Sequence, residues 1–252
     1  MTGATGTLGR RLVGELARRG HHVVAATSRR AADSIGSIRY VTVDLATGEG
    51  LDGAAGEAEA IVHSATDPRR TAMVDIGGLR LLDKAALPGV RLVFPSIVGC
   101  DLIPNPYYRA KTECEELLTA LGRPWAILRA TQFHQLIWGW YSRPTRNPLL
   151  FVPAATRYQV LDPLEMARQL ADAVEGGHHG RLDDLGGSFA YEATDLAKSV
   201  VAAIGSGRRV IGYNRPGLVG AALRAGANLT PNRGAGETWN EFVARQIARR
   251  GT

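Results

Sequence analysis

The sequence of 252 residues has only two cysteines, Cys100 and Cys114. Two cysteines exclude a framework of disulfides, and their spacing matches no metal-binding motif. No apolar run reaches the roughly 18 residues that a membrane span requires. The first residues also lack the basic and then apolar order of a signal peptide. We therefore expect a reduced, cytoplasmic protein with no metal and no membrane partner.

Aromatic residues are few, at 6%, and arginine far outnumbers lysine in a chain of net charge +6. The arginines are scattered as short pairs, for example Arg10-Arg11 and Arg69-Arg70, and they form no basic stripe interleaved with aromatic rings. We therefore expect no nucleic-acid partner. A small molecule is the expected substrate, and the composition leaves the oligomeric state open.

Strand and helix patterns alternate through the first half of the chain. Helical spacing of apolar residues covers 8–17 and 70–86, and a third helix follows Pro106 over 106–122. Short apolar strands fill the intervals, at 21–29, 37–45, 59–66, 90–99 and 125–131. This alternation predicts an α/β fold with a doubly wound parallel sheet of the Rossmann type.

The second half has weaker patterns. It suggests helices at 132–142, 193–204 and 238–249, a helix that begins after Asp162, and extended segments at 151–161, 181–187 and 208–214. Thr238 and Glu241 have the spacing of a capping box. We expect one NAD(P)-binding domain over 1–252, in which 132–160 and 181–252 form a small C-terminal substrate lobe or lid.

A glycine turn opens the chain as T-G-A-T-G-T-L-G over residues 2–9. Such a turn lets backbone amides approach a pyrophosphate, and the helix behind it adds a favourable partial charge. The alternative interpretation is a helix-start turn without a ligand, because a lone glycine trio is a weak signal. The candidate cofactor contacts in this turn are Gly3, Thr5, Gly6, Thr7, Leu8 and Gly9.

Later strand ends carry further candidate contacts. The end of the second strand, where an acid would favour NAD, has no acidic residue over 21–32 and instead offers Ser28 and Arg29. Arginine favours the 2′-phosphate, so we expect NADP(H) in preference to NAD(H). A solvent-facing arginine pair is the alternative. Asp44 is suited to an adenine amino group or to capping a turn. Asp44 and Leu45 stand at the end of the strand at 37–45. Ala65 and Thr66 stand at the end of the strand at 59–66 and are the remaining candidate contacts.

Tyr107 and Lys111 stand four residues apart in a predicted helix and so share one face. An ammonium beside a phenol favours the phenolate, which suits the tyrosine to proton transfer. Ser96, at the end of the fifth strand, is placed to hydrogen-bond a reacting oxygen. The alternative interpretation is a surface Tyr–Lys pair and an unrelated strand-end serine.

The chain resembles the short-chain dehydrogenase/reductase superfamily, and within it the atypical, NmrA-like NAD(P)H-binding group. The resemblance rests on TGATGTLG (2–9), TSRR (27–30), VDL (43–45), HSAT (63–66), FPSIVG (94–99), PYYRAKTECEELL (106–118), PWAILRATQFH (124–134) and G-x-T-W-x-E-F (236–242). It implies that Ser96, Tyr107 and Lys111 are catalytic and that Lys111 also holds the nicotinamide ribose. Two features depart from the family pattern: no asparagine stands for a fourth catalytic residue, and Tyr108 adjoins Tyr107.

The expected function is an NADP(H)-dependent oxidoreductase that reduces a small carbonyl, quinone or enone. A redox sensor that binds NAD(P)H without turnover is the alternative, since the resembling group includes such members. A nucleotide-sugar epimerase or dehydratase ranks last, because the second half is short for a nucleotide-sugar site.

Almost nothing precedes the glycine turn, although the fold normally places a central strand there. Losing three or four of that strand's buried side chains costs about 5–12 kcal/mol, comparable to the stability of a whole domain. The sequence therefore predicts a missing or truncated first strand, and we hypothesise that the natural chain starts upstream of Met1.

Overall fold

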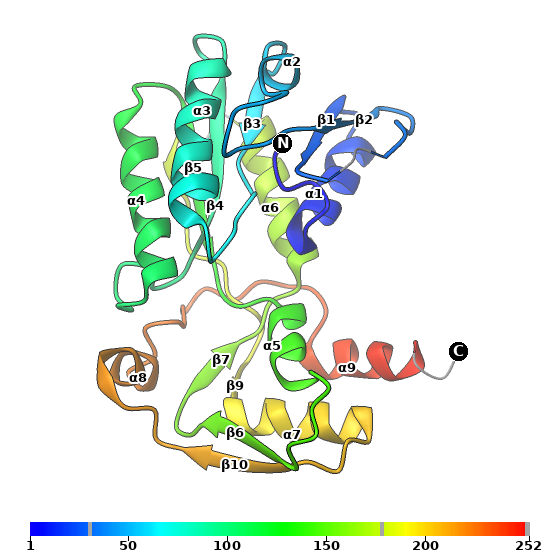
Figure 1. Ribbon diagram of the computed structural model, residues 1–252, viewed down its shortest axis with the longest axis vertical. Coiled ribbons are helices and arrows are strands. Elements are labelled where there is room, and N and C mark those ends of the chain that lie inside the picture. Colours follow the sequence, from blue (N-terminus) through cyan, green and yellow to red (C-terminus); the bar gives the residue numbers. More distant parts are fainter. Residues whose placement is uncertain (30–31, 177–178, 250–252) are drawn as a thin grey trace. The chain divides into compact units, whose positions relative to one another are not determined.

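The computed structural model describes residues 1–29, 32–176 and 179–249 (Figure 1). The chain divides into two compact units, which are described separately. Unit 1 comprises Met1–Ser96, Pro106–Arg129 and Met166–Asp183, and unit 2 comprises Ile97–Asn105, Ala130–Glu165 and Asp184–Thr252.

Unit 1 is built on parallel strands. β1 (Val23–Thr27) pairs with β2 (Ile38–Thr42) in parallel. A second sheet has the order β3-β4-β5-β8, formed by Ala60–Val62, Arg91–Ile97, Trp125–Ala130 and Gly180–Arg181. The β3–β4 and β5–β8 pairs are parallel. The predicted α/β fold with a parallel sheet is confirmed.

The segment before the glycine turn runs between these two sheets. The Thr2 N–H donates to the Val62 carbonyl at 3.0 Å, and the Ala26 N–H donates to the Met1 carbonyl at 2.8 Å. Its only ladder pairing among the described residues is an isolated parallel bridge between Thr2 and His63. The first strand is thus reduced to a single bridge at the position where the sequence predicts a truncated strand.

The helices of unit 1 are α1 (Thr7–Arg18), α2 (Asp52–Ala55), η1 (Ala72–Gly77), α3 (Gly78–Ala85), α4 (Pro106–Ala120) and most of α6 (Pro163–Glu175). Apolar residues of α3 and α4 pack against the strands in one core that includes Leu79, Leu118, Phe94 and Ile127. The predicted helical pattern over 70–86 is observed as two consecutive helices, of which the first, Ala72–Gly77, is π-helical. The wider π-turn buries Asp75 beside Ile76.

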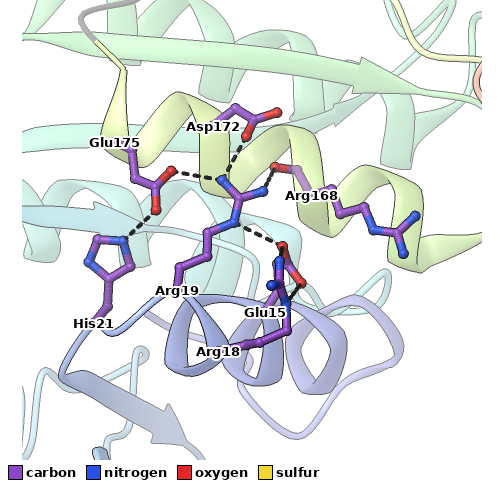
Figure 2. A network of polar contacts seen from close by, with 7 residues as sticks. All are labelled: Glu15, Arg18, Arg19, His21, Arg168, Asp172 and Glu175. Carbon is purple, nitrogen blue, oxygen red and sulfur yellow. Dashed lines mark hydrogen bonds and ion pairs between the residues drawn. The ribbon is translucent and has the colours of Figure 1, made fainter.

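Helices α1 and α6 lie side by side and are joined by ion pairs (Figure 2). The guanidinium of Arg19, at the end of α1, contacts Glu15 at 2.8 Å, Asp172 at 2.6 Å and Glu175 at 2.8 Å. His21 Nε2 lies 2.9 Å from Glu175. The C-terminal end of α1 is therefore held on α6, while its N-terminal end carries the glycine turn.

Unit 2 contains two small sheets. β6 (Leu149–Pro153) pairs in parallel with β10 (Arg209–Tyr213), and β7 (Arg157–Gln159) pairs antiparallel with β9 (Ala190–Glu192). The predicted extended segment 151–161 is thus two strands, separated by a turn in which Ala155 has a φ of 51°. The helices are α5 (His134–Tyr141), α7 (Ala193–Ile204), α8 (Gly217–Arg224) and α9 (Trp239–Ala248).

The core of unit 2 joins α5, α7 and α9 to the strands, with Trp239 and Phe242 among its buried side chains. The predicted capping box of Thr238 and Glu241 is confirmed at the start of α9. Asp162 also caps its helix, since its Oδ1 accepts the Leu164 N–H at 3.0 Å. Throughout the described ranges, no helix is both long and apolar enough to cross a membrane.

Candidate dinucleotide and proton-transfer site

The glycine turn is shaped by close backbone contacts within unit 1. The Gly6 N–H donates to the Gly3 carbonyl at 3.0 Å. Gly3 has a φ of +67°, and a Cβ there would lie 2.7 Å from the Ala65 nitrogen. A Cβ on Gly9 would lie 2.0 Å from the Gly3 carbonyl oxygen. The protein itself therefore requires glycine at positions 3 and 9.

Gly6 differs from its two partners because its Cα is exposed. A Cβ there would come within 4 Å of one described atom, the Gly3 carbonyl oxygen, at 3.2 Å. Among the described residues no side chain caps α1, and its first turn has no acidic residue. Free amides and a small, exposed residue at a helix N-terminus suit a bound phosphate. The turn therefore fits the pyrophosphate of a dinucleotide.

The other predicted contacts of the turn have different surroundings. Thr5 Oγ1 lies 3.2 Å from Thr27 Oγ1, which ties the turn to the end of β1. Thr7 is exposed at the start of α1, whereas Leu8 is buried in the core. Any contact of Leu8 with a phosphate would therefore come from its backbone amide.

Ser28 and Arg29 follow β1 with exposed side chains. The backbone of Arg29 is fixed on both sides: its N–H donates to Thr27 Oγ1 at 3.2 Å, and its carbonyl accepts from Thr42 Oγ1 at 3.3 Å. Arg30, the last residue of the TSRR motif, lies outside the described residues. An exposed arginine on a fixed backbone suits a phosphate contact, and its role stays a prediction.

Two further candidates follow β2. Asp44 Oδ1 accepts the Ala46 N–H at 2.8 Å, so this carboxylate caps its own turn. Leu45 is 8% exposed and packs in the core. The turn-capping alternative for Asp44 is thus observed, and its contact with an adenine stays a prediction. Leu45 has only its backbone to offer a cofactor.

Ala65 and Thr66 follow β3 and connect the turn to the candidate chemical residues. The Ala65 N–H donates to Thr2 Oγ1 at 3.2 Å, beside the turn. Thr66 Oγ1 lies 3.1 Å from the hydroxyl of Tyr107. The residues after β3 therefore place the phenol near the glycine turn, within one unit.

Tyr107 and Lys111 share a face at the start of α4, as their spacing predicts. Lys111 Nζ lies 5.6 Å from the centre of the Tyr107 ring and 4.9 Å from that of Phe94. Tyr107 is half-buried, whereas the Lys111 side chain is only 5% exposed. Ser96 is buried on β4 two residues after Phe94, so it lies on the face of the strand that meets Lys111.

Asp75 is the site residue that sequence reasoning missed. Its fully buried carboxylate lies 2.9 Å from Lys111 Nζ and 2.6 Å from Thr66 Oγ1. Its other oxygen accepts the Asp67 N–H at 3.1 Å. The sequence signal for Asp75 was an acidic residue within the apolar helical pattern of 70–86. A regular helix gave no reason to expect that this side chain is buried.

Burial and the neighbouring groups act on the pKa of Lys111 in opposite directions. Burial disfavours its charged form, but the attraction of Tyr107 and Asp75 prevails and raises the pKa of Lys111. Burial lowers the pKa of His63 to about 4, so this residue is neutral near pH 7. Its Nδ1 lies 2.9 Å from Thr2 Oγ1, and its Nε2 lies 2.9 Å from the Asp75 carbonyl. His63 therefore serves packing rather than proton transfer.

This arrangement defines a class of protein: a parallel α/β sheet with a glycine turn for a dinucleotide and a Tyr–Lys pair beside it. The family model for NAD(P)H-binding proteins matches residues 3–136, more than half of the chain, and the chain belongs to that family. The expected resemblance to the NmrA-like, atypical short-chain dehydrogenase/reductase group is confirmed. The chain binds a nicotinamide dinucleotide.

Individual relatives bear different functional names. The photosystem II assembly factor Ycf39 of Cyanophora paradoxa is 28% identical over 207 residues, which cover 77% of this chain and 64% of that protein. The NADPH-dependent quinone oxidoreductase QOR2 of Escherichia coli has a TM-score of 0.71 at 16% identity, with 98% of each chain covered. The NAD complex of UDP-glucose 4-epimerase from Thermus thermophilus has a TM-score of 0.72 at 18% identity, with 100% and 98% covered. The two structures share the fold.

Proposed function

We propose that this protein is an NADP(H)-dependent oxidoreductase that reduces a small carbonyl, quinone or enone. The observation that carries the proposal is the half-buried phenol of Tyr107 over the buried Lys111 ammonium, in the unit that contains the glycine turn. A phenol held beside an ammonium is suited to giving a proton to a substrate oxygen. The proposed setting is the cytoplasm, with a small-molecule substrate.

Each residue of the site has a proposed role. Tyr107 donates a proton to the substrate oxygen, and Ser96 orients that oxygen with a hydrogen bond. Lys111 stabilises negative charge on the phenol oxygen and holds the nicotinamide ribose with its remaining N–H donors. When bound, the nicotinamide supplies the hydride.

The proposed preference for NADP(H) depends on Arg29, with Ser28 assisting. The end of β1 offers an exposed arginine and no acid, and a 2′-phosphate is a good partner for a guanidinium. QOR2 has been crystallised with NADPH, whereas the epimerase complex holds NAD, so cofactor preference varies on this fold.

The test is NADPH oxidation with a panel of quinones, enones and aldehydes. Tyr107→Phe keeps the ring and removes the phenol, and we expect kcat to fall by about 10²-fold or more. Tyr108→Phe is the matched control, because Tyr108 is the adjacent half-buried tyrosine of the same helix. A larger effect at Tyr108 would move the catalytic role to that residue, and activity unchanged in both variants would reject the reductase proposal.

A redox sensor is the second candidate, and the similarity to Ycf39 favours it, since that relative is named as an assembly factor. The chain spans 64% of the length of that relative. A sensor would bind NADPH tightly, show no turnover on any substrate of the panel and be indifferent to Tyr107→Phe. Isothermal titration with NADPH beside the turnover assay separates the two functions.

A further inference from the structure

We propose that Asp75 is a positioning residue of the candidate reductase site: its buried carboxylate holds the Lys111 ammonium and the Thr66 hydroxyl, and through Thr66 it sets the direction of the Tyr107 hydroxyl. This inference rests on the proposed function for its catalytic meaning. The contacts that support it lie within unit 1 and join three segments: η1, the end of β3 and the start of α4.

The carboxylate of Asp75 receives three donors. Oδ1 receives the Lys111 ammonium at 2.9 Å and the Thr66 hydroxyl at 2.6 Å, and Oδ2 receives the Asp67 N–H at 3.1 Å. A buried carboxylate is costly unless its oxygens are paired and hydrogen-bonded. These three contacts offset the cost of burying the carboxylate, and Asp75 in turn fixes the two side chains that it binds.

The Thr66 hydroxyl has one proton to give. The shorter contact of Thr66 is the one to Asp75 Oδ1, so the proton of Thr66 goes to the carboxylate. The Tyr107 hydroxyl lies 3.1 Å from Thr66 Oγ1. With its own proton on Asp75, Thr66 has only lone pairs left for this contact, and we infer that the phenol donates to it. Through Thr66, Asp75 thus sets the direction in which the Tyr107 hydroxyl points.

Asp75 also balances the charge of Lys111. The ammonium is buried against Phe94, where an unpaired charge would be strongly disfavoured. Two other titratable groups that act on Lys111 are neutral near pH 7: burial lowers the pKa of His63 to about 4 and raises that of the Cys114 thiol to about 12. Removing the Asp75 charge leaves Lys111 with the phenol of Tyr107 as its stabilising neighbour.

The lysine content of the chain allows a direct test. Lys84, Lys111 and Lys198 are its three lysines, and the other two are exposed. We would label lysine with ¹³Cε, assign the signals with Lys84→Arg and Lys198→Arg, and follow their pH titration by NMR. In Asp75→Asn we expect Lys111 to lose its proton about one pH unit or more below the wild type, with Lys84 and Lys198 unchanged. Asp75→Glu should restore part of the difference.

Thr66→Val provides the second variant, at an exposed residue. It should leave the Lys111 titration unchanged and lower kcat for NADPH oxidation. An Asp75→Asn protein whose Lys111 titrates like the wild type would overturn the proposal. If Asp75→Asn does not fold, a Thr66→Val enzyme with wild-type kcat would overturn it. The titration needs no turnover, so its failure is distinct from the failure of Tyr107→Phe to change activity.

Discussion

The Arg19 network between α1 and α6 should be a main contributor to the stability of unit 1. The Arg19 side chain is 17% exposed and donates to Glu15, Asp172, Glu175 and the Arg168 carbonyl (Figure 2). Its neighbour Arg18 is 69% exposed and contacts Glu15 alone in this network. Arg18 and Arg19 are thus adjacent residues of equal charge that differ in burial and in the number of groups they contact. They can therefore serve as a matched pair of variants.

The expected cost of Arg19→Ala follows from these contacts. Its bond to the buried Glu15 contributes about 1 kcal/mol, because Arg18 still pairs with Glu15 in the variant. The pairs with Asp172 and Glu175 are more exposed and each contribute less than the bond to Glu15. We expect a total loss of about 1–3 kcal/mol for Arg19→Ala and a smaller loss for Arg18→Ala, whose side chain is exposed.

The pH dependence of stability gives a second measure of the same network. Hydrogen bonds from Arg18 and Arg19 lower the pKa of Glu15 to about 2, from an ordinary value of 4.5. A depressed folded pKa stabilises the protein above the unfolded pKa, and this contribution is lost as the pH falls through the folded value. The wild type should therefore lose stability between about pH 4.5 and 2, and Arg19→Ala should lose less over that range.

The assay is urea unfolding at pH 7 in low and high salt, repeated at acidic pH. The cost of Arg19→Ala should persist in high salt better than that of Arg18→Ala, because partly buried pairs are screened less. Equal costs for the two variants, or a cost below about 0.5 kcal/mol for Arg19→Ala, would refute the reasoning that burial and multiple partners make this network strong.

Two further predictions concern the cofactor. Gly6→Ala should fold normally and weaken NADPH binding by about tenfold or more in a fluorescence titration, because its Cβ would occupy the approach to the helix N-terminus. Gly9→Ala should instead lower the melting temperature, because its Cβ would lie 2.0 Å from the Gly3 carbonyl oxygen. A Gly6→Ala protein that is destabilised but binds NADPH normally would argue against a pyrophosphate at Gly6. Arg29→Ala should weaken NADPH binding by about tenfold with little change for NADH, whereas Arg39→Ala, an exposed control on β2, should change neither. Equal losses for both cofactors would exclude a 2′-phosphate contact.

Periodicity and turn residues were sufficient to predict most of unit 1. Strands such as β1 and β4 are short apolar runs, and α4 begins at Pro106 as its sequence predicts. Helix α8 (Gly217–Arg224) was missed because it is short and contains Gly217 and Gly220, which weaken a helical signal. The strand break at Ala155 was missed because a positive φ at alanine has no sequence signal.

The candidate site shows where pattern reasoning stops. A spacing of four residues correctly placed Tyr107 and Lys111 on one face, because helical geometry is local. The partner of Lys111 comes from a segment 36 residues earlier, and a π-turn that no propensity predicted brings it inward. Charge balance in a buried site depends on such distant contacts. The sequence predicts Tyr107 as the partner of the Lys111 ammonium, whereas in the structure this ammonium also pairs with Asp75. The same Tyr–Lys motif without this carboxylate would leave the buried ammonium without its ionic partner.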